Sequence, residues 1–113
     1  MTDVEFAEAE FERIAEDRLA RFADALERGL AEAADVDYQG GILTVALDRG
    51  GEYVLNKHAP NRQIWLSSPV SGAAHFAFDA ANATWISTRS NRVLGELLAD
   101  ELGPLANGPL DLG

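Results

Sequence analysis

The apolar residues change their spacing twice along the chain, and this change constrains the fold more than any other feature of the sequence. Over the first 30 residues they recur on one stripe at the helical period of about 3.6. The members of the stripe are Phe11, Ala15, Leu19, Phe22, Leu26 and Leu30. Thr2 and Glu5 have the spacing of a capping box, and the helix is expected to end near Gly29. The stripe therefore predicts one long amphipathic helix that buries a single face.

Short segments of strand-like alternation follow this helix, with turn residues between them. The glycine pairs at 40–41 and 50–51 mark turns, because glycine adopts positive φ without steric cost. The expected strands are residues 35–38, 42–47, 52–57, 62–67, 75–79 and 84–87. Strands joined by such short connections form an antiparallel meander.

The helical spacing returns near the C-terminus, over residues 91–102. Ser90 or Asn91 can cap this second helix, and the Gly-Pro pair at 103–104 ends it. Three leucines of the tail are expected to lie against the helices: Leu105, Leu110 and Leu112. The order of helix, strands and helix predicts one α+β domain over residues 1–113, with two helices packed on one face of an antiparallel β-sheet.

The net charge of −10 lies mostly at one end of the sequence. Residues 1–37 hold 12 acids and 4 arginines, a net of −8, whereas residues 38–113 hold 7 acids and 5 basic residues, a net of −2. Such a field repels nucleic acid and anionic membranes and attracts cations or a basic partner. No apolar run approaches the roughly 18 residues that span a bilayer. We expect a bacterial cytoplasmic protein, with a mitochondrial matrix protein that has lost its presequence as the alternative.

Acidic side chains cover the exposed side of the first predicted helix and continue into the first strand. They are Glu12, Glu16, Asp17, Asp24, Glu27, Asp35 and Asp37. Carboxylates are hard oxygen donors that suit ferrous or ferric iron, manganese and calcium. A flat array of this kind binds a metal loosely, with water in the remaining positions. The alternative is a solvated helix face in an acidic protein.

The fourth predicted strand gives the sheet an outward-facing tryptophan. Strict alternation puts Ile64 and Leu66 on one side and Trp65 on the other. If the aliphatic pair faces the helices, Trp65 is solvent-exposed and suited to dock a protein, while Trp85 is buried. The alternative is the reverse parity, with Trp65 in the core.

The two histidines, His58 and His75, are expected at the surface, with His75 on the same outer face as Trp65. Two histidines do not make a zinc site in a chain without cysteine, which also lacks disulfides and thiol nucleophiles. The sequence contains no catalytic triad, nucleophile elbow or P-loop spacing. No catalytic residue is therefore assigned.

Residues 53–72 resemble the signature of the frataxin family, which includes mitochondrial frataxins and the bacterial CyaY proteins. They read YVLNKHAPNRQIWLSSPVSG, against the family pattern Y-V-I-N-K-x-x-P-N-[KR]-Q-I-W-L-S-S-P-x-S-G. The resemblance extends to residues 11–15, 41–45, 75–76, 85 and 96–98, and so covers nearly the whole chain. It implies an α-β sandwich fold.

The resemblance also implies a function. Frataxins bind iron on an acidic ridge, which matches the seven acids named above, and contact a cysteine desulfurase–scaffold complex. The matching contact residues on the sheet face are Asn56, Lys57, Asn61, Gln63 and Trp65, and His75 stands where many mitochondrial members carry arginine. We therefore expect a regulator of iron–sulfur cluster assembly that binds iron weakly.

Several alternatives stay open at this level. One is a ferroxidase or iron store, which would make the protein an enzyme or a reservoir. Another is an acidic interaction module that binds no metal. A monomer is expected, with iron-driven oligomerisation as a further possibility.

Overall fold

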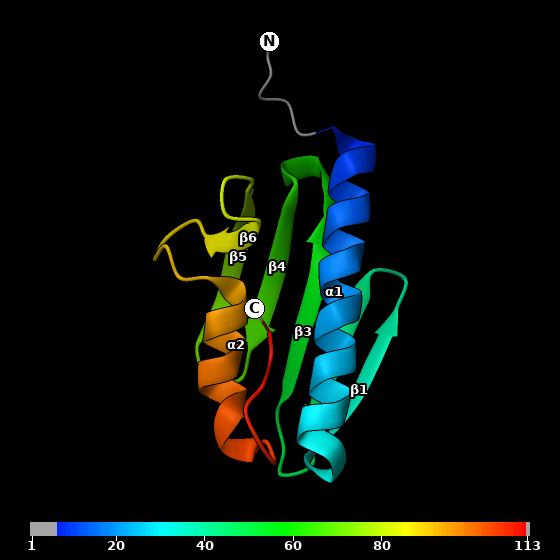
Figure 1. Ribbon diagram of the computed structural model, residues 1–113, viewed down its shortest axis with the longest axis vertical. Coiled ribbons are helices and arrows are strands. Elements are labelled where there is room, and N and C mark those ends of the chain that lie inside the picture. The colour runs from blue at the N-terminus through cyan, green and yellow to red at the C-terminus, as the bar shows by residue number, and fades with distance from the viewer. Residues whose placement is uncertain (1–6, 113) are drawn as a thin grey trace.

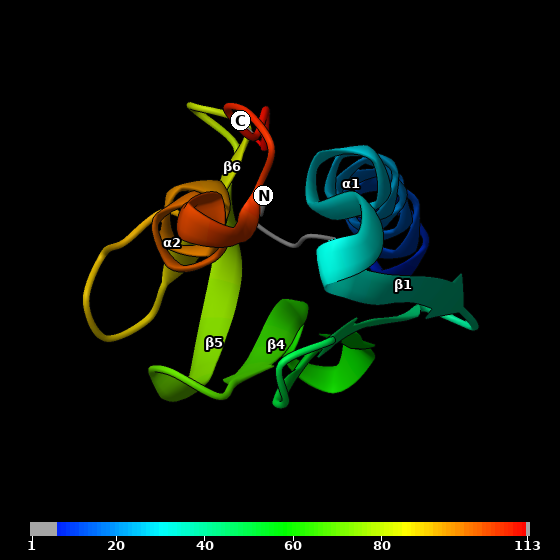
Figure 2. The ribbon, with the colours of Figure 1, turned by 90° about the horizontal axis from the view of Figure 1, so that it is seen from below.

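Two helices lie on one face of a six-stranded antiparallel sheet in the computed structural model, which describes residues 7–112 (Figures 1 and 2). This arrangement confirms the predicted α+β class. The helices and strands are, in chain order, α1 (Glu8–Leu30), β1 (Ala34–Gln39), β2 (Ile42–Leu47), β3 (Glu52–His58), β4 (Gln63–Ser68), β5 (Gly72–Asp79), β6 (Thr84–Ser87) and α2 (Leu94–Leu102). Neither of the two helices in this described part is long and apolar enough to cross a bilayer.

The strands follow one another across the sheet in chain order, each antiparallel to its neighbours. Register aligns Leu43, Leu55 and Leu66 on adjacent strands, and all three are buried beneath the helices. Ile42, Asn56 and Trp65 form the neighbouring row, one residue along, on the opposite side of the sheet. Because side chains alternate along a strand, this register fixes which residues face the helices and which form the outer face.

The core lies between the helices and the sheet. All six residues of the predicted stripe on α1 are buried, which confirms the helical spacing as the main folding signal. Phe11 meets Trp85 edge-to-face, with ring centroids 6.0 Å apart. Trp85 is 2% exposed, as predicted.

The C-terminal segment passes between the two helices (Figure 2). Leu112 is buried, and the amide of Asn107 donates a hydrogen bond to the carbonyl oxygen of Gly29 over 3.0 Å. The carbonyl of Leu112 lies so close to Gly95 that a side chain on Gly95 would collide with it. These contacts confirm that the tail packs against the helices.

A polar cluster ties the sheet to α2 at the edge of the core. The hydroxyl of Tyr53 donates to Glu101 over 2.8 Å, and the hydroxyl of Ser68 donates to the same carboxylate oxygen over 2.6 Å. Burial, with the hydrogen bond to Glu101, raises the pKa of Tyr53 to about 12. The cluster therefore holds the Tyr53 phenol in its protonated form, as the donor to the side chain of Glu101.

Several element boundaries differ from the sequence prediction. Helix α2 begins at Leu94 instead of residue 91, because Asn91 has a left-handed backbone with a φ of 62°. Neither Ser90 nor Asn91 caps the helix: its N-cap is Val93, which provides no side-chain acceptor. Strand β5 begins at Gly72, where register pairs it with Ser68. The capping box of Thr2 and Glu5 lies outside the described residues.

Candidate functional site: an aromatic stack on the sheet and an acidic helix

Trp65 lies at the centre of the outer face, between two histidine rings. Its indole stacks on His58 and on His75, with ring centroids 3.7 and 4.2 Å away and both interplanar angles at 10°. We call these three residues the aromatic stack. The prediction that Trp65 points away from the helices is confirmed, since Ile64 and Leu66 on either side are buried. The prediction that it is solvent-exposed is wrong in extent: the two imidazoles cover both faces of the ring, and Trp65 is half-buried.

Strand register explains how the stack forms. His75 on β5 lies directly opposite Trp65 on β4, and His58 ends β3 two positions beyond Asn56, which is the other neighbour of Trp65. The indole Nε1 of Trp65 donates to the side-chain oxygen of Gln63 over 2.8 Å. The ring is therefore fixed on both faces and at its polar edge. Such a ring loses little conformational entropy when a partner binds it.

The row that crosses the sheet at Trp65 contains an exposed aliphatic side chain as well. Ile42 lies opposite Asn56 on β2 and is 46% exposed. The sequence analysis did not single out Ile42, although the burial of Leu43, Val45 and Leu47 would have placed it outward by alternation. Asn61 is exposed in a 3-10 turn, Ala59–Asn61, at one end of this face.

A second residue missed by the sequence analysis borders the stack. Arg89 lines a hollow of about 170 Å³ together with His75 and Thr88. A guanidinium group is thus present beside the position where the family resemblance leads one to expect arginine and the chain has His75. It comes from the segment after β6 instead of from the strand itself.

Lys57 lies on the helix side of the sheet, not on the outer face where it was expected. Its neighbours along β3, Asn56 and His58, point outward, so alternation turns Lys57 toward α1, opposite the buried Ile64. The ammonium group forms ion pairs with Glu12 and Glu16. Burial disfavours the charged ammonium, but these hydrogen bonds prevail and raise the pKa of Lys57.

We call the seven acids assigned by resemblance the acidic ridge. Some of them form ion pairs with basic side chains, and two lie on β1 instead of α1. Glu12 and Glu16 share Lys57, Asp17 pairs with Arg21 over 3.3 Å between Nε and Oδ2, and Asp24 pairs with Arg28. Asp35 and Asp37 are exposed on β1, where they alternate with the half-buried Val36 and Tyr38. The β1 acids therefore point to the opposite side of the sheet from α1.

This arrangement contains no ready-made metal centre. Over residues 7–112, no three histidine, cysteine, aspartate or glutamate side chains come together in a way that could hold a metal ion. Four of the seven ridge carboxylates already have a cationic partner. The remaining three, Glu27, Asp35 and Asp37, are exposed. Such donors offer a cation one or two oxygens each, with water in its other positions.

Known proteins match this chain along most of its length. A family model described as the frataxin-like domain matches residues 4–108. The mitochondrial frataxin homolog of Schizosaccharomyces pombe is 38% identical over 106 residues, which are 90% of this chain and 67% of that protein. The mitochondrial frataxin of Arabidopsis thaliana is 47% identical over 78 residues, 69% of this chain and 42% of that protein. The chain thus spans between two fifths and two thirds of these two relatives' lengths.

Solved structures share the fold as well. Frataxin from Psychromonas ingrahamii matches with a TM-score of 0.80 over 94% of this chain and 97% of that one; at 22% identity this supports the fold alone. Trimeric frataxin from the yeast Saccharomyces cerevisiae, complexed with ferrous, is 36% identical with a TM-score of 0.73, over 84% of this chain and 87% of that one. Because the family model covers nearly the whole sequence and the fold agrees, this chain belongs to the frataxin family.

Proposed function

We propose that the protein docks through its outer face on a cysteine desulfurase–scaffold complex of iron–sulfur cluster assembly and regulates that complex. The observation that carries the proposal is the aromatic stack: Trp65 is fixed on the outer face by His58, His75 and Gln63. The core does not require this aromatic ring, because Trp65 lies on the opposite side of the sheet from the helices. Rigid aromatic side chains on an otherwise polar surface are typical anchors of protein interfaces.

The neighbours of Trp65 extend the docking surface. Ile42 adds exposed apolar area on one side of the row, and His75 with Arg89 borders a hollow on the other. Asn56, Gln63 and Asn61 supply amide groups around this centre. An apolar centre with a polar rim is the usual anatomy of a protein–protein interface.

Iron binds, in this proposal, as a loosely held cargo on the acidic ridge. Within residues 7–112, the ridge carboxylates without a cationic partner are Glu27, Asp35 and Asp37, and these are the most available donors. At Glu12 and Glu16 iron competes with the ammonium group of Lys57, which weakens binding there. The solved structure of yeast frataxin in complex with ferrous iron supports iron as the metal.

An assay of sulfide release tests the docking proposal directly. The cognate desulfurase and scaffold are measured alone, with the parent protein and with Trp65→Ala. We expect the parent to change the rate and Trp65→Ala to weaken the effect by about 2 kcal/mol of binding free energy or more. The matched control is Val70→Ala, which truncates an apolar side chain that is 66% exposed in the turn between β4 and β5. Equal potency of Trp65→Ala and the parent would refute docking through this face.

A ferroxidase or iron store is the alternative function. The trimeric assembly of the solved yeast frataxins favours it, because an assembly can complete a metal site that one chain leaves open. Iron-dependent oxygen consumption by the isolated protein tests this alternative.

A monomer is our proposal for the iron-free protein, and sedimentation with and without iron tests it. The proposed location is the bacterial cytoplasm, with the mitochondrial matrix as the alternative because the relatives are named mitochondrial.

A further inference from the structure

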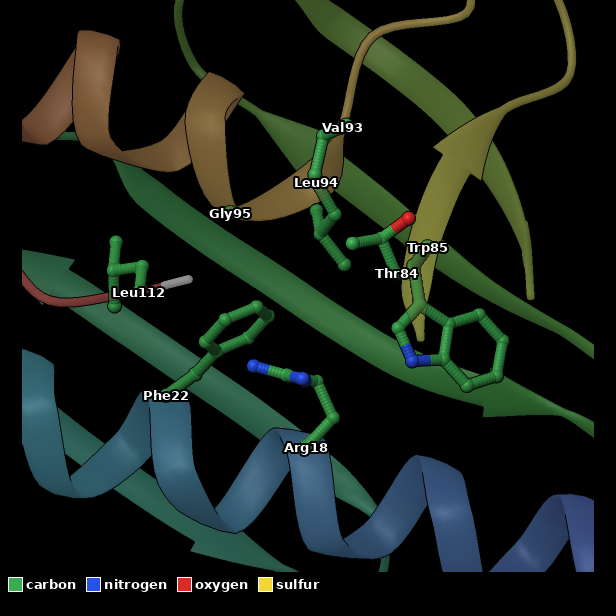
Figure 3. Close-up of a pocket in the computed structure, with 8 residues that line it drawn as sticks. All are labelled: Arg18, Phe22, Thr84, Trp85, Val93, Leu94, Gly95 and Leu112. Carbon is green, nitrogen blue, oxygen red and sulfur yellow. The ribbon is translucent and has the colours of Figure 1, made fainter. Parts of the chain in front are cut away.

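A small cavity lies where α1, β6, α2 and the C-terminal segment meet, on the helix side of the sheet and away from the aromatic stack (Figure 3). Its volume is about 10 Å³, which accommodates a single oxygen atom of water size. Arg18 from α1 and Trp85 from β6 border it, together with Leu94 and Gly95 at the start of α2. Four separate parts of the chain thus converge on one atom-sized space.

One hydrogen-bond donor that lines the cavity has no acceptor among the described residues. The indole Nε1 of Trp85 is buried and has no hydrogen-bond partner among the described residues, although Trp85 is only 2% exposed. Buried polar groups almost always have a partner, and leaving one unpaired costs about 1–3 kcal/mol. Figure 3 shows the guanidinium group of Arg18 extending toward Phe22, and it shows this nitrogen on the edge of the indole that faces the Arg18 side chain. An acceptor placed between them would satisfy both donors.

The guanidinium group of Arg18 is only loosely engaged by the protein. It donates to the carbonyl oxygen of Ala83 over 3.5 Å and lies 5.7 Å from the ring centroid of Phe22. No carboxylate of residues 7–112 forms an ion pair with it. The charge of Arg18 therefore favours an anion over a neutral acceptor.

The start of α2 adds a third set of donors. The helix is nine residues long and begins at Leu94, and no side chain caps the amides of its first turn. These amides, together with the helix dipole, favour negative charge at this end. By itself an uncapped helix start does not define a site, but here it borders the same cavity as the unpaired indole of Trp85.

A larger groove adjoins the cavity and leaves room for the rest of a ligand. Its volume is about 240 Å³, and it shares Arg18, Phe22 and Leu112 with the cavity. Arg21 and Arg28 also border the groove, but their charges are offset by ion pairs with Asp17 and Asp24. Asp111 contributes one further negative charge. This balance suits a small anion of low charge.

We propose that this pocket binds an oxyanion, with one oxygen between Trp85 Nε1 and Arg18 and the rest of the group in the adjoining groove. The shared chemistry is that of a phosphate or a carboxylate group. The site lies on the opposite side of the sheet from the docking face and adjoins the acidic ridge at Asp24, and the proposal stands whether or not the docking function is correct. Binding would join α1 to β6 and α2, and so would stabilise the folded state.

The indole N–H signal of Trp85 in a proton–nitrogen NMR spectrum reports on the site directly. The chain has two tryptophans, and Trp65→Phe identifies which signal belongs to Trp85. The parent is titrated at constant ionic strength with inorganic phosphate, with acetate and with chloride. We expect a saturable shift with phosphate, with acetate or with both, and the arm that shifts identifies the source of the oxyanion. A saturable shift of the same size with chloride would overturn the proposal of an oxyanion site.

Variants of two arginines on the same helix separate binding from general salt effects. Arg18→Gln removes the charge at the cavity, and it should weaken phosphate or acetate binding roughly tenfold or more. Arg18→Lys keeps the charge and should retain part of the affinity. The matched control, Arg13→Gln, removes an exposed arginine that borders neither hollow, and it should bind as the parent does. The proposal would be overturned if the Trp85 indole signal did not shift with phosphate or acetate, or if it shifted identically in the parent and in Arg18→Gln. Either result would mean that the cavity holds water and not an oxyanion.

Discussion

Lys57 lies between the two layers of the sandwich, with its ammonium group held by Glu12 and Glu16. Taken from the sequence, these two glutamates are a repulsive i,i+4 pair that costs about 0.2–0.5 kcal/mol. The structure changes this interpretation, because one lysine from a distant strand pairs with both carboxylates and offsets part of their repulsion. The same contact places a residue expected on the docking face at the acidic ridge, where under the proposed function its ammonium group competes with iron.

Replacing Lys57 by methionine separates these effects, since methionine keeps the apolar stem. We expect Lys57→Met to lower the free energy of unfolding by about 1 kcal/mol, because a partly exposed ion pair is lost and the glutamates repel each other. Iron binding should strengthen, because a competing cation is gone. Urea unfolding and iron titration measure the two effects. Arg28→Met, which removes the exposed partner of Asp24, is the control and should change stability less. Unchanged iron affinity in Lys57→Met would show that Glu12 and Glu16 do not bind iron.

Tyr53 makes part of the stability of the fold depend on alkaline pH. Its pKa is raised in the folded state, from about 10 when unfolded to about 12, so folding favours the protonated phenol. Its contribution to stability is therefore complete below about pH 10 and is lost as the pH rises through about 12.

Tyr53→Phe tests this assignment. We expect the variant to be less stable than the parent by about 0.5–1.5 kcal/mol at neutral pH, where one hydrogen bond to Glu101 is lost. The difference should narrow in strong alkali, as the parent loses the same contribution. Urea unfolding at both pH values measures it, and the ultraviolet absorbance of phenolate reports the titration. A difference that does not depend on pH would contradict the raised pKa of Tyr53.

At the scale of the elements, the contact of α2 with the C-terminal segment depends on a glycine. Gly95→Ala improves helix propensity, yet its new methyl group would meet the backbone carbonyl of Leu112. We expect a net loss of about 1–3 kcal/mol, because a backbone segment must move to make room. Gly103→Ala is the matched control at the other end of the helix: no atom lies within 4 Å of the added carbon, and its φ of −53° is helical. Thermal unfolding of both variants makes the comparison. If both variants were as stable as the parent, the C-terminal segment would not pack against α2 as described.

Sequence patterns predicted the elements well where one periodicity acted alone. The stripe from Phe11 to Leu30 and the alternation around Trp65 were sufficient, because burial of one face decides both. The predicted start of α2 was wrong, because Ser90 and Asn91 are residue types that often cap helices. In the structure they lie in a turn, in which the hydroxyl oxygen of Ser87 accepts hydrogen bonds from two backbone N–H groups. The ion pairs of Lys57 and the stack of His58 on Trp65 could not be predicted, since they depend on the side-chain conformations of residues on different elements.

At the scale of the whole molecule, the net charge of −10 acts on the rate of association more than on the lifetime of a complex. A basic partner surface should be attracted over about 10 Å at 0.1 M salt and over shorter distances at higher salt. We therefore expect the association rate with the desulfurase–scaffold complex to fall as salt rises, while the dissociation rate changes little. Stopped-flow mixing over a salt series measures both rates. The control is Trp65→Ala, which should raise the dissociation rate and leave the salt dependence of association unchanged. Association that does not respond to salt would show that the field does not steer the partner.

Two acids of the ridge, Asp35 and Asp37, lie on β1, which is an edge strand of the sheet. An edge strand offers unpaired backbone groups to the edge of a second molecule, and charged side chains oppose that approach. Asp35 and Asp37 are exposed on β1, and between two copies of the same strand they would repel each other. Acid or a bound cation, by neutralising these carboxylates, would remove the barrier. Asp35 and Asp37, assigned to metal binding by resemblance, would thus also oppose extension of the sheet of one molecule by the next.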